Sequence, residues 1–119
     1  MKIKEAKELE RQILKSDRHF VISKEIIRKF DLNTSLFLAI LWEAEYKAEM
    51  DGTIKSGWFH IGTNEIKERI EMSYYTQMKC INNLQKAGIL EWKNEGIPRR
   101  RYFRIDWDRF SEIIEEEVE

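Results

Sequence analysis

Apolar residues in the first quarter of the chain recur at helical spacing. Residues 3–15 carry such a stripe, so they are predicted to form an amphipathic helix. Ser23 is expected to cap a second, short helix, whose inner face carries Ile26, Ile27 and Phe30. The chain is therefore expected to begin with helices.

A longer helix is predicted next, with Asn33 as its cap. Leu32 and Phe37 occupy the staple positions that flank such a cap. The helix should end before the turn signal Asp51-Gly52, and residues 58–61 read as a short strand. Its apolar face is too wide for a surface helix, which predicts the central helix of the core, with inward positions Leu36, Phe37, Ile40, Leu41 and Ala44.

Two further helices are predicted after this strand. The first covers residues 65–72, with Gly62 at its cap. Ser73 caps the second, over residues 73–87, whose inward positions are Gln77, Ile81 and Leu84. Gly88 falls where a helix ends with a residue in the left-handed conformation. Helices joined by so short a turn indicate a helix-turn-helix.

The segment after Gly88 alternates like a β-hairpin. Residues 89–93 and 100–105 are the predicted strands, and residues 94–98 the turn between them. Asp106 should then cap a final helix over residues 107–116. The expected fold is mainly α with a small β-hairpin: a winged helix-turn-helix domain spanning residues 1–119, with its core at about 20–106 and extra helices at 3–15 and 107–116.

Composition narrows the class of protein. The longest apolar run, residues 36–42, has seven members, whereas a membrane span needs about 20. The amino terminus carries no apolar signal core, and the single cysteine, Cys80, cannot form an internal disulfide. These features predict a cytoplasmic protein that does not enter a membrane. Cys80 itself is expected to be a small buried hydrophobe.

The net charge of −1 conceals an uneven distribution. Residues 106–119 contain seven acids and one base, a net charge of −6, which leaves +5 on residues 1–105. Residues 89–105 alone carry five bases against two acids. A basic patch of this kind can meet a phosphate backbone even though the whole chain is slightly acidic.

The candidate DNA-binding residues lie on the second helix of the pair and on the hairpin. In a helix-turn-helix, the second helix enters the major groove with its first residues nearest the base edges. Asn can read adenine, and Lys favours guanine or phosphate. The outward positions of the recognition helix are Tyr74, Tyr75, Met78, Lys79, Asn82, Asn83 and Lys86, and the cations of the wing, residues 90–105, are Lys93, Arg99, Arg100, Arg101 and Arg104.

Residues 58–105 resemble the winged helices of phage replication initiators and replisome organisers, the DnaD-type group, and more loosely those of many bacterial repressors. Gly62 stands where such domains often place Ser or Thr, and Tyr74-Tyr75 where basic residues are common. The resemblance implies a DNA-binding protein of phage or mobile-element type, acting in replication initiation or transcriptional regulation. The stretches that carry it are Gly57-Trp58-Phe59, Glu65-Ile66, Ser73-Tyr74-Tyr75-Thr76-Gln77, Leu84-Gln85-Lys86-Ala87-Gly88-Ile89-Leu90 and Gly96-Ile97-Pro98-Arg99-Arg100-Arg101-Tyr102-Phe103-Arg104-Ile105.

Two alternatives stay open at this point. The arginine triplet can be a solvated strand edge that discourages edge-to-edge pairing, and the fold can serve as a protein-interaction module that binds a replication or host protein instead of DNA. No nucleophile arrangement or phosphate loop stands out, and His19 and His60 have no ligand spacing around them. We therefore expect neither an enzyme nor a metal or cofactor.

Both ends of the chain carry an apolar stripe that needs a partner. Residues 1–18 have six bases and four acids, opposite in sign to the acidic end. Because isolated helices of this length are marginal in water, the terminal helices are expected to pack on the domain or on each other. Packing across a homodimer would present two recognition helices to double-stranded DNA.

Overall fold

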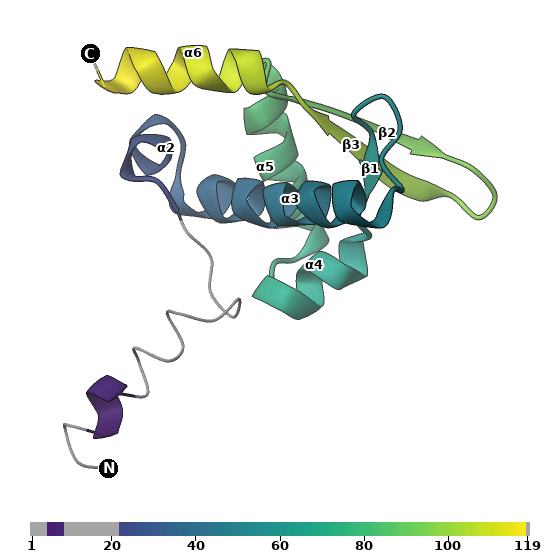
Figure 1. Cartoon of the computed structure of the whole chain (residues 1–119), viewed down its shortest axis with the longest axis horizontal. Helices are drawn as coiled ribbons and strands as arrows, with labels where there is room; N and C mark the ends of the chain where they lie inside the picture. Colours follow the sequence, from purple (N-terminus) through teal and green to yellow (C-terminus); the bar gives the residue numbers. More distant parts are fainter. Residues whose placement is uncertain (1–4, 9–21, 119) are drawn as a thin grey trace.

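The computed structural model describes residues 5–8 and 22–118 (Figure 1). Residues 5–8 are helical, and the rest of the predicted helix at 3–15 lies outside the described residues. The elements that follow are α2 (Lys24–Lys29), α3 (Leu32–Asp51), β1 (Phe59–His60), α4 (Thr63–Ile70), α5 (Tyr74–Lys86), β2 (Leu90–Glu95), β3 (Arg100–Ile105) and α6 (Trp107–Val118). This is the expected fold class, mainly helical with a small antiparallel sheet.

Helix α3 is the central element of the core. Phe37, Ile40 and Leu41 on its inner face are completely buried. Gly52 ends the helix in the left-handed conformation, with φ of +70°, and its N–H donates to the carbonyl oxygens of Ala48 and Glu49. The wide apolar face thus predicted the position of this helix correctly.

The cap of α3 differs from the prediction. Asp31, not Asn33, is the N-cap, because its carboxylate accepts a hydrogen bond of 2.6 Å from the backbone N–H of Thr34. This shifts the staple positions, and Leu32 is 61% exposed instead of packed at the helix start. The prediction of the inner face of α2 was also wrong at Ile27, which is 37% exposed, whereas Ile26 and Phe30 pack against the core.

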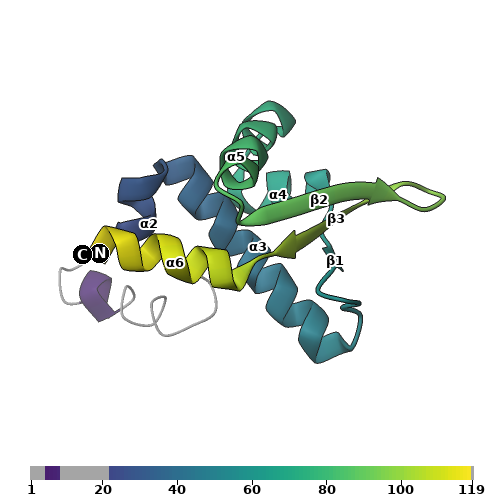
Figure 2. The ribbon, with the colours of Figure 1, turned by 90° about the horizontal axis from the view of Figure 1, so that it is seen from above.

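The sheet has three antiparallel strands in the order β1-β3-β2. Phe103 in the middle strand pairs with Phe59 on one side and Trp92 on the other. Its ring meets Phe37 of α3 edge to face, with the ring centroids 6.1 Å apart. The sheet is therefore fixed to the central helix at Phe103, and the β2–β3 hairpin extends away from the body of the molecule (Figures 1 and 2).

Helices α4 and α5 form the helix-turn-helix. The Oγ atom of Ser73 accepts a hydrogen bond from the N–H of Thr76, so Ser73 caps α5 as predicted. Gln77, Ile81 and Leu84 face inward and are fully buried, and Cys80 lies beside them at 1% exposure. Burial raises the pKa of the Cys80 thiol. A buried, neutral thiol agrees with the small hydrophobe that the sequence predicted.

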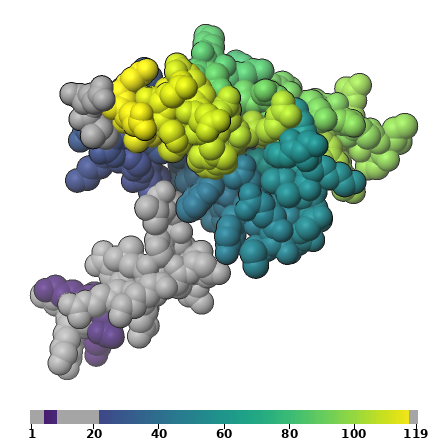
Figure 3. All heavy atoms as spheres, turned by 45° about the horizontal axis from the view of Figure 1, so that its top comes forward, coloured from purple at the N-terminus to yellow at the C-terminus, as the bar shows by residue number. Residues whose placement is uncertain are grey.

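Helix α6 packs on the domain within one chain. Asp106 caps it by accepting a hydrogen bond from the N–H of Arg109. Ile113 is 1% exposed. Helix α6 runs beside α2 and across α3 (Figure 2), and it lies over part of both in the space-filling view (Figure 3). Trp107 Nε1 donates to both carboxylate oxygens of Glu45 on α3, at 2.9 and 3.1 Å. Within the described part of the chain, no helix is both long and apolar enough to cross a membrane.

The buried carboxyl of Glu45 should make stability depend on pH. Desolvation raises its pKa above the ordinary value of 4.5, although the hydrogen bond from Trp107 partly opposes this. A raised folded pKa means that the contribution of this group is fully present below the unfolded pKa and is lost as pH rises through the folded one. Glu45→Gln keeps an acceptor for Trp107 and cannot ionise. We expect this variant to melt above the parent at pH 7, with the difference shrinking toward pH 4.5 and below.

Glu68→Gln provides the matched control, because Glu68 is an exposed glutamate on α4. The melting temperature of this variant should change between pH 7 and low pH by the same amount as that of the parent. If the melting temperatures of Glu45→Gln and the parent differed by the same amount at every pH, this would contradict the raised pKa of Glu45.

Candidate nucleic-acid interface

A cleft of about 190 Å³ separates the helix-turn-helix from the wing, and we call it the wing cleft. The start of α5 forms one wall and the β2–β3 hairpin the other, with the start of α4 at one end. The residues that line it are His60, Gly62, Thr63, Tyr74, Met78, Trp92, Asn94, Arg99, Arg100 and Arg101. The recognition helix and the wing, which follow each other in the sequence, therefore share one surface.

The outer face of α5 carries five of the predicted contact residues in exposed positions. Tyr74 and Tyr75 at its start are 59% and 69% exposed. Lys79 Nζ lies 4.7 Å from the centroid of the Tyr75 ring, one helical turn away. Asn82 and Lys86 continue the same exposed face. This face offers two cations, an amide and two aromatic hydroxyl groups, and no acid.

Two predicted contact residues on α5 are held by the protein itself. The Nδ2 atom of Asn83 donates a hydrogen bond of 3.0 Å to Thr34 Oγ1 on α3. Met78 is partly buried against the core and lines the wing cleft. Both residues sit at the border between the buried and exposed faces of the helix, where helical spacing alone does not decide the side. Asn83 joins α5 to α3 through this hydrogen bond.

The arginine triplet divides between two environments. Arg99 and Arg100 are exposed at the tip of the wing. Arg101 is only 6% exposed, because it shares the inner face of β3 with Phe103 and Ile105. Arg99 and Arg101 were both predicted as DNA contacts of the wing, and both line the wing cleft, but Arg99 is exposed there and Arg101 is buried. The alternating apolar residues Phe103 and Ile105 are the sequence signal that could have placed it.

Lys93 and Arg104 lie on the opposite face of the hairpin, around Trp58. Their charged groups stack on its ring, at 4.3 and 4.7 Å from the centroid. Each also pairs with an acid, Lys93 with Glu95 at 2.8 Å and Arg104 with Glu91. These two cations are therefore largely occupied within the wing, and the exposed charge of the hairpin resides in Arg99 and Arg100.

Gln77 connects the recognition helix to its surroundings from a fully buried position. Its Nε2 atom donates to the carbonyl oxygen of Thr63 at the start of α4, at 3.1 Å, and to that of Met72 in the turn, at 2.9 Å. Its Oε1 atom accepts a hydrogen bond of 2.7 Å from Arg101 Nη2. One amide thus fixes α4, α5 and the wing relative to one another. Helical spacing predicted the inward position of Gln77, but no signal in the sequence indicated this role.

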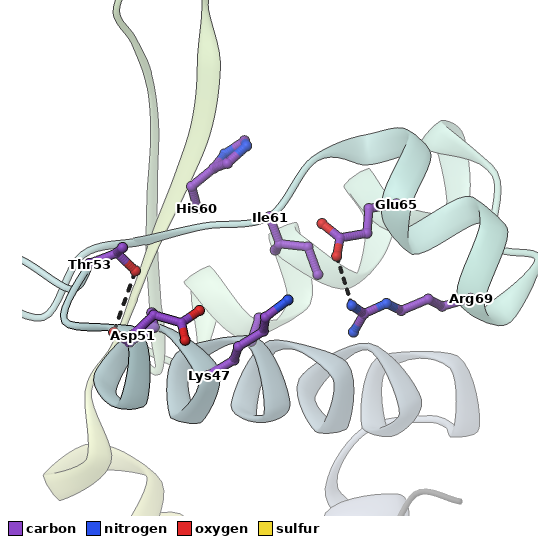
Figure 4. A pocket seen from close by; sticks show the side chains of 9 residues that line it. Lys47, Asp51, Thr53, His60, Ile61, Glu65 and Arg69 are labelled. Atoms are coloured by element: carbon purple, nitrogen blue, oxygen red, sulfur yellow. Dashed lines mark hydrogen bonds and ion pairs between the residues drawn. The ribbon is translucent and has the colours of Figure 1, made fainter. Parts of the chain in front are cut away.

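A second cleft, between α3 and α4, is a weaker candidate for binding a charged ligand (Figure 4). Its cations Lys47 and Arg69 are balanced by Asp51 and Glu65, and Arg69 pairs with Glu65 at 2.7 Å. The ring of His60 points away from Lys47 and Asp51. Among the residues that the structure describes, no three His, Cys, Asp or Glu side chains are grouped to hold a metal ion.

Comparison with known proteins identifies solved structures of similar fold. No family model and no curated protein matches the sequence. The structure of a Rep–DNA complex is similar, with a TM-score of 0.61 and 13% sequence identity over 89% of this chain and 82% of that chain. The N-terminal domain of a DNA-binding protein is also similar, with a TM-score of 0.57 and 12% identity over 98% of this chain and 93% of that chain.

Replacing Gln77 should test its role as the junction. Gln77→Leu keeps a side chain of similar size but leaves two carbonyl oxygens and the Nη2 atom of Arg101 without their partner. An unpaired buried polar group costs about 1–3 kcal/mol, so we expect the free energy of unfolding to fall by about 3 kcal/mol or more. Chemical denaturation measures it. Gln85→Leu, at an exposed position of the same helix, should change it little, and an equal effect of both substitutions would contradict the junction.

Proposed function

We propose that this chain binds duplex DNA, with the start and outer face of α5 in the major groove and the tip of the wing against the phosphate backbone. The observation that carries the proposal is the placement of exposed cations that form no salt bridge on both α5 and the wing. Lys79 and Lys86 lie on α5, and Arg99 and Arg100 on the wing. A duplex lying across this surface would contact both sets at once.

The two structures of similar fold support this proposal. One is a Rep–DNA complex and the other a domain of a DNA-binding protein. Because residues 58–105 resemble phage replication initiators, we favour a role at a replication origin over one as a repressor. We accordingly propose a non-enzymatic initiator of phage or mobile-element type.

A second candidate is a protein-interaction module on the same fold. An apolar groove favours it: α2, α3 and α6 leave a hollow of about 460 Å³ lined by Ile22, Ile26, Leu38, Ala39, Trp42, Trp107 and Phe110. Trp42 is 53% exposed at its rim. The groove lies away from α5 and the wing, so a second copy of the chain or another replication protein could pack there while DNA is bound.

Binding to random-sequence duplex DNA, followed by fluorescence anisotropy across a salt series, tests the proposed function. Affinity should fall steeply with salt, because phosphate contacts release counterions. Arg99→Ala with Arg100→Ala should weaken binding to every sequence and reduce the slope of log K against log salt by about 2. Lys79→Ala or Asn82→Ala should instead change which sequences are preferred.

Arg28→Ala with Lys29→Ala is the matched control, because these exposed cations lie on α2, away from the proposed interface. This double variant should bind DNA like the parent. Absence of any binding to duplex DNA at low salt would overturn the proposed function in favour of the protein-interaction module.

A further inference from the structure

The guanidinium of Arg101 is a positive charge at the inner end of the wing cleft without a counter-charge. Its Nη2 atom donates to Gln77, but its Nε and Nη1 atoms are buried and have no hydrogen-bond partner among the described residues. No carboxylate of the described chain lies within ion-pair distance of it. Burial lowers the pKa of Arg101 to about 10, so the group is still charged at neutral pH.

A buried, unpaired charge is costly for the folded state. The ring of Phe103, whose centroid lies 5.0 Å from the guanidinium carbon, offers partial compensation. An aromatic face attracts a cation far less than an anion does at contact distance. The position of Arg101 thus calls for a negatively charged group that none of the described residues supplies.

The start of α4 lines the same cleft and has no side-chain cap, although Glu65 stands in its first turn. Gly62 is its N-cap and provides no side chain to accept a hydrogen bond from the first turn. Gly62 and Thr63 both line the wing cleft. The backbone N–H groups at such a helix start favour an anion, and the helix dipole adds to the attraction. Two independent features of the cleft therefore suit the same kind of ligand.

We propose that the wing cleft is a binding site for a single phosphate group, held between the start of α4 and the guanidinium of Arg101. This rests on the proposed function in one respect, since we assign the phosphate to the backbone of bound DNA. A volume of about 190 Å³ is smaller than the 300–1,000 Å³ typical of sites for whole organic ligands. It suits a phosphate and not a complete nucleotide.

A phosphate that enters the cleft first meets the residues at its rim. These are Arg99, Arg100 and, in the first turn of α5, Tyr74, and they attract the anion. The covered Nε and Nη1 atoms of Arg101 then turn toward the phosphate oxygens, where the planar fork can donate two parallel hydrogen bonds. Because Arg101 also donates to Gln77, this movement links phosphate binding to the junction between wing and recognition helix.

Thermal melting of the full chain in sodium phosphate, compared with sodium chloride at equal ionic strength and pH, tests the site without DNA. A ligand that binds only the folded state raises its melting temperature. We expect phosphate to do so for the parent and for Arg28→Met, which removes an exposed cation from α2. Arg101→Met should abolish the difference between the two salts.

Gly62→Asp is a second variant, which should raise the melting temperature in chloride and abolish the further rise caused by phosphate. The backbone of Gly62 suits any residue, and an added Cβ would meet no atom within 4 Å. Aspartate is a favourable N-cap, so this variant should melt higher than the parent in chloride. Its carboxylate occupies the position of the anion, so the phosphate effect should disappear. Retention of the phosphate effect by Arg101→Met and Gly62→Asp would overturn the site.

Duplex DNA binding by the same variants separates the sources of the phosphate. If the parent binds DNA and both variants bind it at least tenfold more weakly, the site holds a backbone phosphate as proposed. A phosphate effect that depends on Arg101 in a chain that does not bind DNA would keep the site, assign it to free phosphate and reject the proposed function. DNA binding unaffected by either variant would reject the site's role in DNA binding and leave the proposed function standing.

Discussion

The buried amide of Gln77 determines how the two halves of the interface face each other. It bonds to the start of α4, to the turn and to Arg101 on the wing. A hairpin of two strands is marginally stable by itself, so the wing depends on such contacts and on the packing of Phe103 against Phe37. Without them, the exposed cations of α5 and those of the wing would have no fixed separation.

The cations of α5 and the wing fall into two groups, those that stabilise the wing and those that stay exposed. Lys93 and Arg104 are paired and stacked around Trp58 on the outer face of the hairpin, and they stabilise the wing. Lys79, Lys86, Arg99 and Arg100 remain exposed. Six of the seven acids after Ile105 lie at the cap of α6 or within it, and α6 packs beside α2. A chain with a net charge of −1 can therefore present a basic surface on one side.

Local sequence signals predicted the order of elements and several bounds. Ser73 and Asp106 cap helices as expected, and residues 100–105 form the returning strand. Signals failed where two neighbouring residues compete for one role. Asp31 and Asn33 can both cap a helix, and only the folded chain shows which side chain reaches the N–H of Thr34. Residue type predicted Asn83 and Arg101 as contact residues, but it did not reveal their bonds to Thr34 and Gln77, which only the folded chain brings within reach.

Chemical-shift mapping of the ¹⁵N-labelled chain with a short duplex would show whether α5 and the wing form one DNA-facing surface. We expect the largest shifts at the backbone amides of Tyr74, Tyr75, Lys79, Arg99 and Arg100, with small changes on α2 and α6. Shifts concentrated around Trp42 and Phe110 in the apolar groove, with α5 and the wing unaffected, would contradict it.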